Sequence, residues 1–438
     1  MKVQGIINSS KKNKFFPIKF FMIYFIFTFF IFLMSDAAQE IPNLNILSLY
    51  IVSVFCFLFF GYWLGVKSKS PILIDRYDFN SQKKLIILGS IYFIAWGVNL
   101  VLDFGATGFS QILTSIINPG EAYKNKFDVF ENREMLGQVN RVTQFLLLLS
   151  FFSSVFVILL VLNWKKISIF LKIISVSSIF VYIISYLFIG TQKGIGDVVI
   201  YLICGLFLVI CSNNFKLTKK KKFLIYSLVI TFILCMFFYM VIAQGSRAVL
   251  FGQNSSILYN NIHESFIAKN FGEEIAFGFY NTIGYPSHGY LGLSYNLTQD
   301  FQFSYGAGLS PAFESYRLQY FGGEENFLKT YAIRTELATG WPAGMYWATA
   351  FPSFASDLTF FGTIIFIFLI GFIFARTWLR AIIMKDVLAY ALLGQLFVFM
   401  FYLPANNQVL MQRQGFLIII SIIFLAIFRE LRKKKYYV

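Results

Sequence analysis

Ten long apolar stretches constrain the fold of this chain more than any other feature of its sequence. Each is close to the length that an α-helix needs to cross the hydrocarbon core of a bilayer, about 20 residues. We therefore predict an all-α polytopic membrane protein with about ten transmembrane helices. They are expected at 20–34, 46–66, 85–102, 142–162, 167–189, 197–213, 223–243, 359–379, 387–403 and 415–430.

The composition excludes the main alternatives to a membrane fold. Of the 438 residues, 58% are hydrophobic and 13% are charged, which is about half the charged share of a soluble domain. A soluble domain of this size could not bury so much apolar surface. Disordered chains are poor in aromatic residues, which make up 20% of this one. Soluble enzymes and disordered proteins are therefore excluded.

The net charge of +16 reports membrane topology. If the N-terminus is cytoplasmic, the cytoplasmic segments hold 26 of the 37 basic residues and only 4 of the 21 acidic residues. Lysine and arginine are enriched in the cytoplasmic loops of membrane proteins. We therefore predict that both termini are cytoplasmic, and that the basic excess marks orientation rather than a nucleic-acid site.

This topology divides the chain into three parts. Residues 1–243 are expected to hold transmembrane helices 1–7, with a medium external loop at 103–141. Residues 244–358 form a large external loop, and residues 359–438 hold helices 8–10 and a basic cytoplasmic tail. Because the cytoplasmic loops are short, any chemistry is expected on the external side.

The large external loop is expected to carry short helices. Ser310-Pro311 followed by Glu314 predicts a helix start, and Gly322-Gly323 ends that helix. A second helix begins near Glu324 and breaks at 339–342. Upstream, 257–270 repeats apolar residues at helical spacing, which places His263 on the polar face of an interfacial helix.

Several chemistries lack their motifs in this sequence. The middles of the predicted helices are almost free of charge, which argues against an ion-coupled transporter. No phosphate-binding loop of a nucleotide hydrolase occurs, nor an Asp-x-Asp pair for a nucleotide sugar. No cluster of His, Cys or carboxylate residues has metal-ligand spacing, so we expect no metal and no cofactor. The four cysteines lie in apolar runs and are expected to be core or lipid-facing residues.

The segment 278–311 has a composition that suits sugar recognition, with six glycines and five tyrosines. Glycines allow tight turns, and tyrosines combine a flat apolar face with a hydroxyl group. Tyr285, Tyr290 and Tyr295 could therefore stack on sugar rings. The alternative is that these tyrosines form part of an interfacial aromatic belt.

His288 lies between Pro286 and Gly289, on a predicted turn. A histidine of near-neutral pKa can accept a proton from a hydroxyl group, which makes His288 a candidate general base. The alternative is a histidine that only hydrogen-bonds its loop or a substrate hydroxyl.

Five basic residues occur in the large loop: Arg247, Lys269, Arg317, Lys329 and Arg334. Arg247 follows predicted helix 7 at the depth of the lipid phosphates. Guanidinium groups bind phosphate oxygens through two parallel hydrogen bonds and keep their charge. These residues could hold a lipid diphosphate, or they could anchor the loop to ordinary phospholipid headgroups.

Four motifs carry a family resemblance: GYPSHGYLGLSY at 284–295, TGWP at 339–342, SDLTFFGT at 356–363 and GTQKGIGD at 190–197. Together with the hydropathy profile, they resemble bacterial O-antigen polymerases, the membrane enzymes that join lipid-linked oligosaccharide repeat units. The resemblance implies a glycosyltransferase C-like fold in the bacterial inner membrane. It also implies a donor on undecaprenyl diphosphate and a lipid-linked acceptor.

The resemblance further implies that arginines in the external loops are needed for function, a role that we carry to Arg247, Arg317 and Arg334. The candidate catalytic residues are His288, Arg334 and Glu336, with His288 or Glu336 as the base. The candidate substrate-binding residues are Arg247, Arg317, Lys193, Tyr285, Tyr290, Trp341 and Asp357.

The function expected from the sequence is polymerisation of lipid-linked repeat units into O-antigen or capsular polysaccharide, by a metal-independent membrane glycosyltransferase. The expected partners are undecaprenyl-diphosphate-linked oligosaccharides, membrane lipids and a polysaccharide chain-length regulator. Two alternatives remain open. One is an O-antigen ligase that transfers polymer to a lipid A core, and the other is a non-enzymatic glycolipid flippase.

Overall fold

The computed structural model describes residues 13–68, 78–106, 108–135, 140–211, 219–252 and 256–435. These residues form helices and loops, with no strand among them. Part of the charge argument falls on residues 1–12, 69–77 and 212–218, which lie outside the described residues. The structure confirms an all-α protein whose helices suit a polytopic membrane protein.

Seven helices are long and apolar enough to cross a membrane. A bent pair, α8 (Arg141–Leu148) and α9 (Phe151–Asn163), meets at 53° and makes an eighth span if it is counted as one. Two shorter apolar helices are α19 (Val387–Tyr402) and the 234–250 part of α12 (Lys219–Leu250). Each of the ten predicted ranges overlaps one of these elements. The seven are α2 (Phe16–Leu33), α4 (Leu44–Lys67), α5 (Phe79–Asp103), α10 (Ile169–Phe188), α11 (Lys193–Cys211), α18 (Phe351–Met384) and α21 (Arg413–Lys435).

The remaining helices are short and lie between the apolar ones. Two of them, α6 and α7, occupy the segment 103–141 that the sequence indicated only as a loop. These elements are α3 (Asp36–Glu40), α6 (Phe109–Ile117), α7 (Pro119–Met135), α13 (Phe266–Phe271), α14 (Glu273–Gly284), α15 (Gly289–Asn296), α16 (Pro311–Phe321), α17 (Tyr331–Thr339) and α20 (Gln408–Met411), with 3-10 turns at Ile262–Glu264 and Asn326–Lys329.

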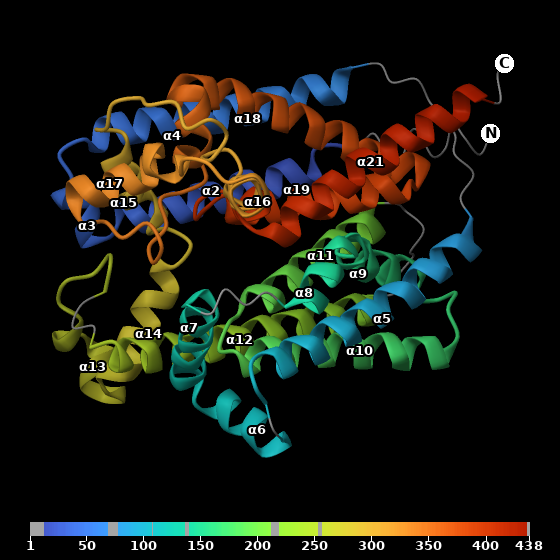
Figure 1. Ribbon diagram of the computed structural model, residues 1–438, viewed down its shortest axis with the longest axis horizontal. Coiled ribbons are helices and arrows are strands. Elements are labelled where there is room, and N and C mark those ends of the chain that lie inside the picture. Colours follow the sequence, from blue (N-terminus) through green and yellow to red (C-terminus); the bar gives the residue numbers. More distant parts are fainter. Residues whose placement is uncertain are drawn as a thin grey trace.

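Helices α4 and α18 pack through glycines and run side by side in Figure 1. A Cβ atom on Gly61 would lie 2.0 Å from the carbonyl oxygen of Phe368, and one on Gly371 would lie 2.2 Å from that of Leu58. Gly65 makes a similar approach one turn after Gly61. Small residues spaced four apart let membrane helices approach at backbone distance. These contacts form the glycine seam between α4 and α18.

Helix α18 contains a break at Thr359, whose φ of 63° and ψ of 164° are not helical. The Thr359 hydroxyl accepts a hydrogen bond from the N–H of Gly362 at 3.2 Å, as an N-cap residue does. The predicted helix at 359–379 therefore begins at this break. The residues 351–358, which the sequence assigned to the large loop, form an additional helical segment in front of it.

Both ends of the described chain lie at one end of the helix bundle. The Trp378 indole donates to the carbonyl of Asn13 at 3.3 Å, near the start of α2. Arg429, near the end of α21, is 2.9 Å from Asp386 in the turn before α19. The opposite end carries α14 to α17, and we call it the loop end (Figure 1).

Candidate functional site

Helix α7 is fixed at the loop end by two close backbone contacts. The N–H of Gly120 donates to the Ser246 hydroxyl on α12 at 3.2 Å, and a Cβ atom on Gly120 would lie 2.5 Å from that oxygen. Gly190 has a φ of 64°, and a Cβ atom there would lie 2.5 Å from the backbone nitrogen of Tyr123. No side chain fits at either glycine, so α7 is held against α12 and the turn after α10.

This docking brings Arg247 of α12 and Lys126 of α7 to one aromatic ring. The Arg247 guanidinium lies 3.9 Å from the centroid of the Tyr123 ring, and the Lys126 ammonium lies 5.3 Å from it. Burial and repulsion by Arg247 lower the pKa of Lys126 to about 8. Neither cation has an acidic ion-pair partner among the residues that the structure describes. We call them the Arg247–Lys126 pair.

The GTQKGIGD motif lies directly beside this pair. Arg247 donates to the carbonyl of Gly190 and to the side-chain oxygen of Gln192, the latter at 3.0 Å. The next residue, Lys193, is paired with Asp197 at 2.9 Å. The motif thus positions Arg247 through neutral oxygens, which leaves its charge uncompensated. Lys193, a candidate substrate-binding residue, is neutralised inside the protein instead.

His288 is buried and held by the backbone. Its Nε2 atom accepts a hydrogen bond from the N–H of Trp347 at 3.2 Å, and the two rings stack with centroids 5.1 Å apart. Burial lowers the pKa of His288 to about 4, although hydrogen bonds to the backbone of Gly284 and Tyr285 oppose the shift. The lone pair that would accept a proton is already used. The geometry favours the alternative in which His288 organises its loop.

Tyr285 connects His288 to the Arg247–Lys126 pair. Its ring lies 4.2 Å from the Trp347 ring and 5.8 Å from the His288 ring, measured between centroids. Burial raises the pKa of Tyr285 to about 12, and the nearby Arg247 charge opposes that rise. Tyr285 is therefore a neutral hydroxyl near Arg247, which suits contact with a phosphate or a sugar.

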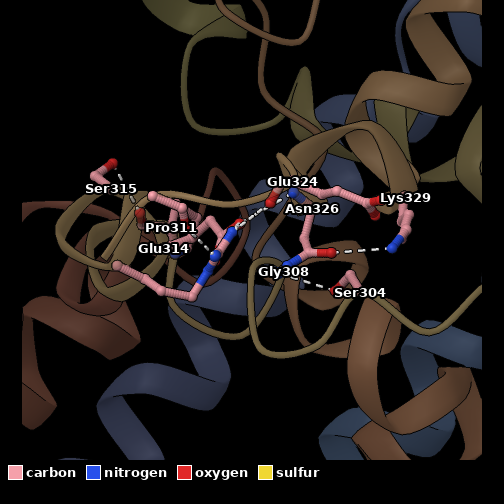
Figure 2. Close-up of polar contacts among 10 residues, drawn as sticks. Ser304, Gly308, Pro311, Glu314, Ser315, Glu324, Asn326 and Lys329 are labelled. Atoms are coloured by element: carbon pink, nitrogen blue, oxygen red, sulfur yellow. Dashed lines mark hydrogen bonds and ion pairs between the residues drawn. The ribbon is translucent and has the colours of Figure 1, made fainter. Parts of the chain in front are cut away.

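Arg317 has a structural partner, the carboxylate of Glu314. Two guanidinium nitrogens donate to the two Glu314 oxygens at 2.7 and 2.6 Å, and a third donates to the carbonyl of Gly322 at 2.8 Å. Glu314 is fully buried and also accepts the N–H of Asn326 at 3.0 Å (Figure 2). Arg317 therefore joins the end of α16 to the following turn. This use of its donors does not favour the substrate-binding role predicted from the sequence.

Arg334 and Glu336 lie together on α17, apart from α7 in Figure 1. Arg334 donates to the carbonyl of Asp300, and its guanidinium lies 5.0 Å from the Tyr331 ring centroid. Its Nε atom is buried and unpartnered. The half-buried Glu336 carboxylate makes no hydrogen bond or ion pair with another described residue. Within the described part of the chain, Glu336 therefore keeps its carboxylate without a partner, and Arg334 keeps its charge without a neutralising acid.

Tyr290 lies in the core rather than at a sugar-accessible surface. Its side chain is fully buried, and its hydroxyl is 3.1 Å from that of Thr28 on α2. The ring also packs against Phe29 and Phe32. Neither the sugar-stacking role nor the interfacial-belt alternative suits this position, because α2 covers the ring completely.

Asp357 holds a loop. Its two oxygens accept hydrogen bonds from the Ser304 hydroxyl and from the N–H groups of Gly306 and Leu309, each at 2.8 Å. A carboxylate with three such bonds positions the 304–309 turn on α18. Its predicted substrate-binding role has no support in this arrangement.

Trp341 belongs to a second aromatic group, with its ring centroid 5.5 Å from that of Tyr295 and 5.1 Å from that of Tyr346. The indole N–H is buried and has no hydrogen-bond partner. Gly292 approaches it closely, since a Cβ atom there would lie 2.8 Å from the indole nitrogen. Trp341 therefore packs α15 against the loop that follows α17.

The predicted start of α16 and the cysteine assignment are confirmed, whereas the second helix begins at Tyr331, after a 3-10 turn at Asn326–Lys329, and not near Glu324 as predicted. Ser310 caps α16 by accepting the N–H of Phe313, and Gly340 ends α17 in a left-handed conformation. All four cysteines are free, two of them buried and two exposed.

His263 lies in a 3-10 turn, 2.9 Å from Glu273, instead of on the longer helix predicted at 257–270. No group of three metal-binding side chains occurs within the described ranges.

Sequence reasoning missed Lys126, Tyr123, Gln192 and Trp347. Tyr123 and Lys126 have the i, i+3 spacing of neighbours on a helix, which is the signal that could have found them. Gln192 acts through its side-chain oxygen and Trp347 through its backbone N–H, and both contacts join distant parts of the chain, which no local pattern encodes. No family model matches the chain, and comparisons with curated proteins and with solved structures also give no match. The case for function therefore rests on the chemistry of these residues.

Proposed function

We propose that the chain is a polysaccharide polymerase that transfers a growing glycan from undecaprenyl diphosphate to a sugar hydroxyl of an incoming lipid-linked repeat unit. The observation that carries this proposal is the Arg247–Lys126 pair, two adjacent cations without an acidic partner at the loop end. Uncompensated buried charge is costly, so such a pair is suited to an anion. A lipid diphosphate supplies negative charge at the depth where a membrane helix such as α12 ends, which is where Arg247 lies.

Arg334 supports the choice of a polymerase, because this reaction brings together two lipids that each carry a diphosphate. Arg334 has a buried, unpartnered Nε and no acidic partner among the described residues. It lies on α17, away from α7 and α12 (Figure 1). One cationic site is proposed for the donor at Arg247 and Lys126, and the other for the acceptor lipid at Arg334.

The proposed reaction is a direct displacement at the anomeric carbon of the donor. The acceptor oxygen forms a bond to that carbon while the bond from carbon to the diphosphate oxygen breaks, and the diphosphate leaves with the electron pair. Arg247 and Lys126 stabilise the charge that develops there. Glu336 is the better of the two candidate bases for the acceptor proton, since the His288 lone pair is occupied. These fixed cations remove the need for a metal.

The setting proposed for this reaction is the bacterial inner membrane, with about ten spans, a glycosyltransferase C-like fold and the site on the external face. The basic residues that gather in alternate loops support this orientation. The start of α2 and the end of α21 lie at the same end of the bundle, as two cytoplasmic termini require. Membrane lipids and a chain-length regulator are the proposed partners.

Deleting the gene and resolving the glycolipids of the strain on a gel tests this function. A deletion strain that makes single-repeat glycolipid without a ladder supports a polymerase. If the wild-type gene restores the ladder in that strain and Arg247→Ala does not, the activity depends on the proposed site. Accumulation of free lipid-linked polymer would indicate a ligase instead. Loss of all outward-facing glycan would indicate a flippase.

A further inference from the structure

A cavity of about 260 Å³ lies between α6, α7 and the end of α10, beside the Arg247–Lys126 pair. Lys126 belongs both to the pair and to the cavity wall. Ile189, another wall residue, precedes Gly190, whose carbonyl accepts a hydrogen bond from Arg247. The cavity is therefore continuous with the site proposed for the diphosphate.

Both ends of α7 are anchored, so the cavity is bounded by a fixed helix. The N-terminal anchor is the contact of Gly120 with Ser246. At the other end, Arg133 is 2.8 Å from Asp103 at the end of α5, and Asn140 also donates to Asp103. A helix held at both ends presents a constant face, which is what recognition of a rigid ligand requires.

The wall is rich in groups that recognise hydroxyls. Asn125, Asp128 and Asn132 repeat at the spacing of one helical face, and their side chains make no hydrogen bond with any other described residue. Amides offer donors and acceptors together, and a carboxylate accepts from hydroxyls. The rings of Phe104 and Phe188 supply the apolar part of the wall. The polar part consists of Gln111, Ser115, Asn125, Lys126, Asp128 and Asn132.

We infer that this cavity is a carbohydrate subsite for the sugar attached to the donor diphosphate. The inference rests on the proposed function, which supplies the diphosphate at Arg247 and Lys126. A sugar bonded to that diphosphate lies next to Lys126, where the polar wall begins. The volume is below that of a typical complete ligand site, so it suits the first part of an oligosaccharide rather than a whole repeat unit.

The test measures binding of two probes to the purified full-length protein in phosphatidylcholine nanodiscs. One probe is undecaprenyl diphosphate, and the other is the lipid-linked repeat unit extracted from the strain. Wild type is expected to bind the repeat more tightly than undecaprenyl diphosphate. Asn125→Ala/Asn132→Ala should remove that advantage, on the order of 10-fold or more, and leave the affinity for undecaprenyl diphosphate unchanged. Alanine favours the helix at both positions, so α7 is retained.

Lys124→Ala is the matched control, because Lys124 is exposed on α7 and does not line the cavity. Equal affinity of wild type for both probes, or an unchanged preference in the double variant, would overturn the carbohydrate subsite while the polymerase proposal stands. Failure of wild type to bind either probe would overturn the proposed function itself. Phosphatidylglycerol could compete with the repeat-unit probe for wild type. If the double variant abolishes that competition, the cavity would be reassigned to a lipid headgroup.

Discussion

The carboxylate of Glu314 is fully buried and receives two guanidinium nitrogens of Arg317 at 2.7 and 2.6 Å. The hydrogen bond from Arg317 holds the pKa of Glu314 below its usual range. A buried carboxylate that loses its partner destabilises a fold strongly. The pair therefore identifies Arg317 as a residue needed for folding of the loop end, although its sequence position suggested a phosphate ligand.

Arg317→Ala is accordingly expected to lower the melting temperature of the purified protein by several degrees and to reduce its cellular amount. Lys269→Ala removes the same charge from an exposed position in the same loop and should leave both unchanged. Thermal unfolding in detergent measures the difference. A stable Arg317→Ala protein that fails to make polymer would instead return Arg317 to the substrate site.

The sequence was sufficient for the apolar helices because a bilayer imposes a length and a composition on each span. It was also sufficient for the start of α16, where Ser310 and Pro311 act locally. It was insufficient for α7, whose mixed composition has no strong period, and for α6, whose apolar residues recur at helical spacing over only nine residues. The spacing of Glu314 and Arg317 on the predicted helix could have indicated their ion pair, but only the folded chain shows that Arg247 has no such partner among the described residues.

Arg247→Lys is expected to abolish the polysaccharide ladder nearly as completely as Arg247→Ala, at unchanged protein level. Lysine keeps the charge but cannot bond both Gly190 and Gln192 while it covers the Tyr123 ring. Gel analysis of glycolipids from complemented deletion strains measures this. A normal ladder from Arg247→Lys would show that charge alone suffices there.

Stability of the protein should depend on pH through His288. The folded chain lowers the pKa of His288 from 6.5 to about 4, so between these values the unfolded chain binds more protons. The free energy of unfolding therefore falls as the pH drops through this window, by about 3 kcal/mol in total. His288→Gln should flatten that part of a stability–pH curve. A curve for His288→Gln that matches wild type would contradict the burial of a neutral ring.

Glu336→Gln is expected to lower turnover by roughly 10²- to 10⁴-fold, the usual loss for a positioned general base, with little change in donor affinity. His288→Ala should instead reduce the amount of folded protein, because the Trp347 N–H loses its acceptor. Single-turnover assays on lipid-linked repeat units separate the two effects. Full turnover by Glu336→Gln would exclude Glu336 as the base.

Reporter fusions test the orientation on which the proposed site depends. A reporter active only in the cytoplasm should function after Lys222, and one active only outside should function near Gly306. The distribution of basic residues between the loops is the reason for this expectation. A cytoplasmic signal at Gly306 would place the Arg247–Lys126 pair on the wrong side for a polymerase.

The glycine seam between α4 and α18 also bears on how the protein adapts to its bilayer. A contact in which a methyl group would overlap a carbonyl oxygen admits no acyl chain, so lipids cannot separate these helices. Helix α17 is attached to α18, since the Tyr331 N–H donates to the Ser356 hydroxyl at 3.0 Å. Arg334 therefore stays in place as membrane thickness varies. Helix α12 is held to α14 by equally close contacts, because Cβ atoms on Gly245 and Gly278 would lie 2.3 and 2.0 Å from the carbonyl oxygens of Glu274 and Val241, so Arg247 is also expected to keep its place.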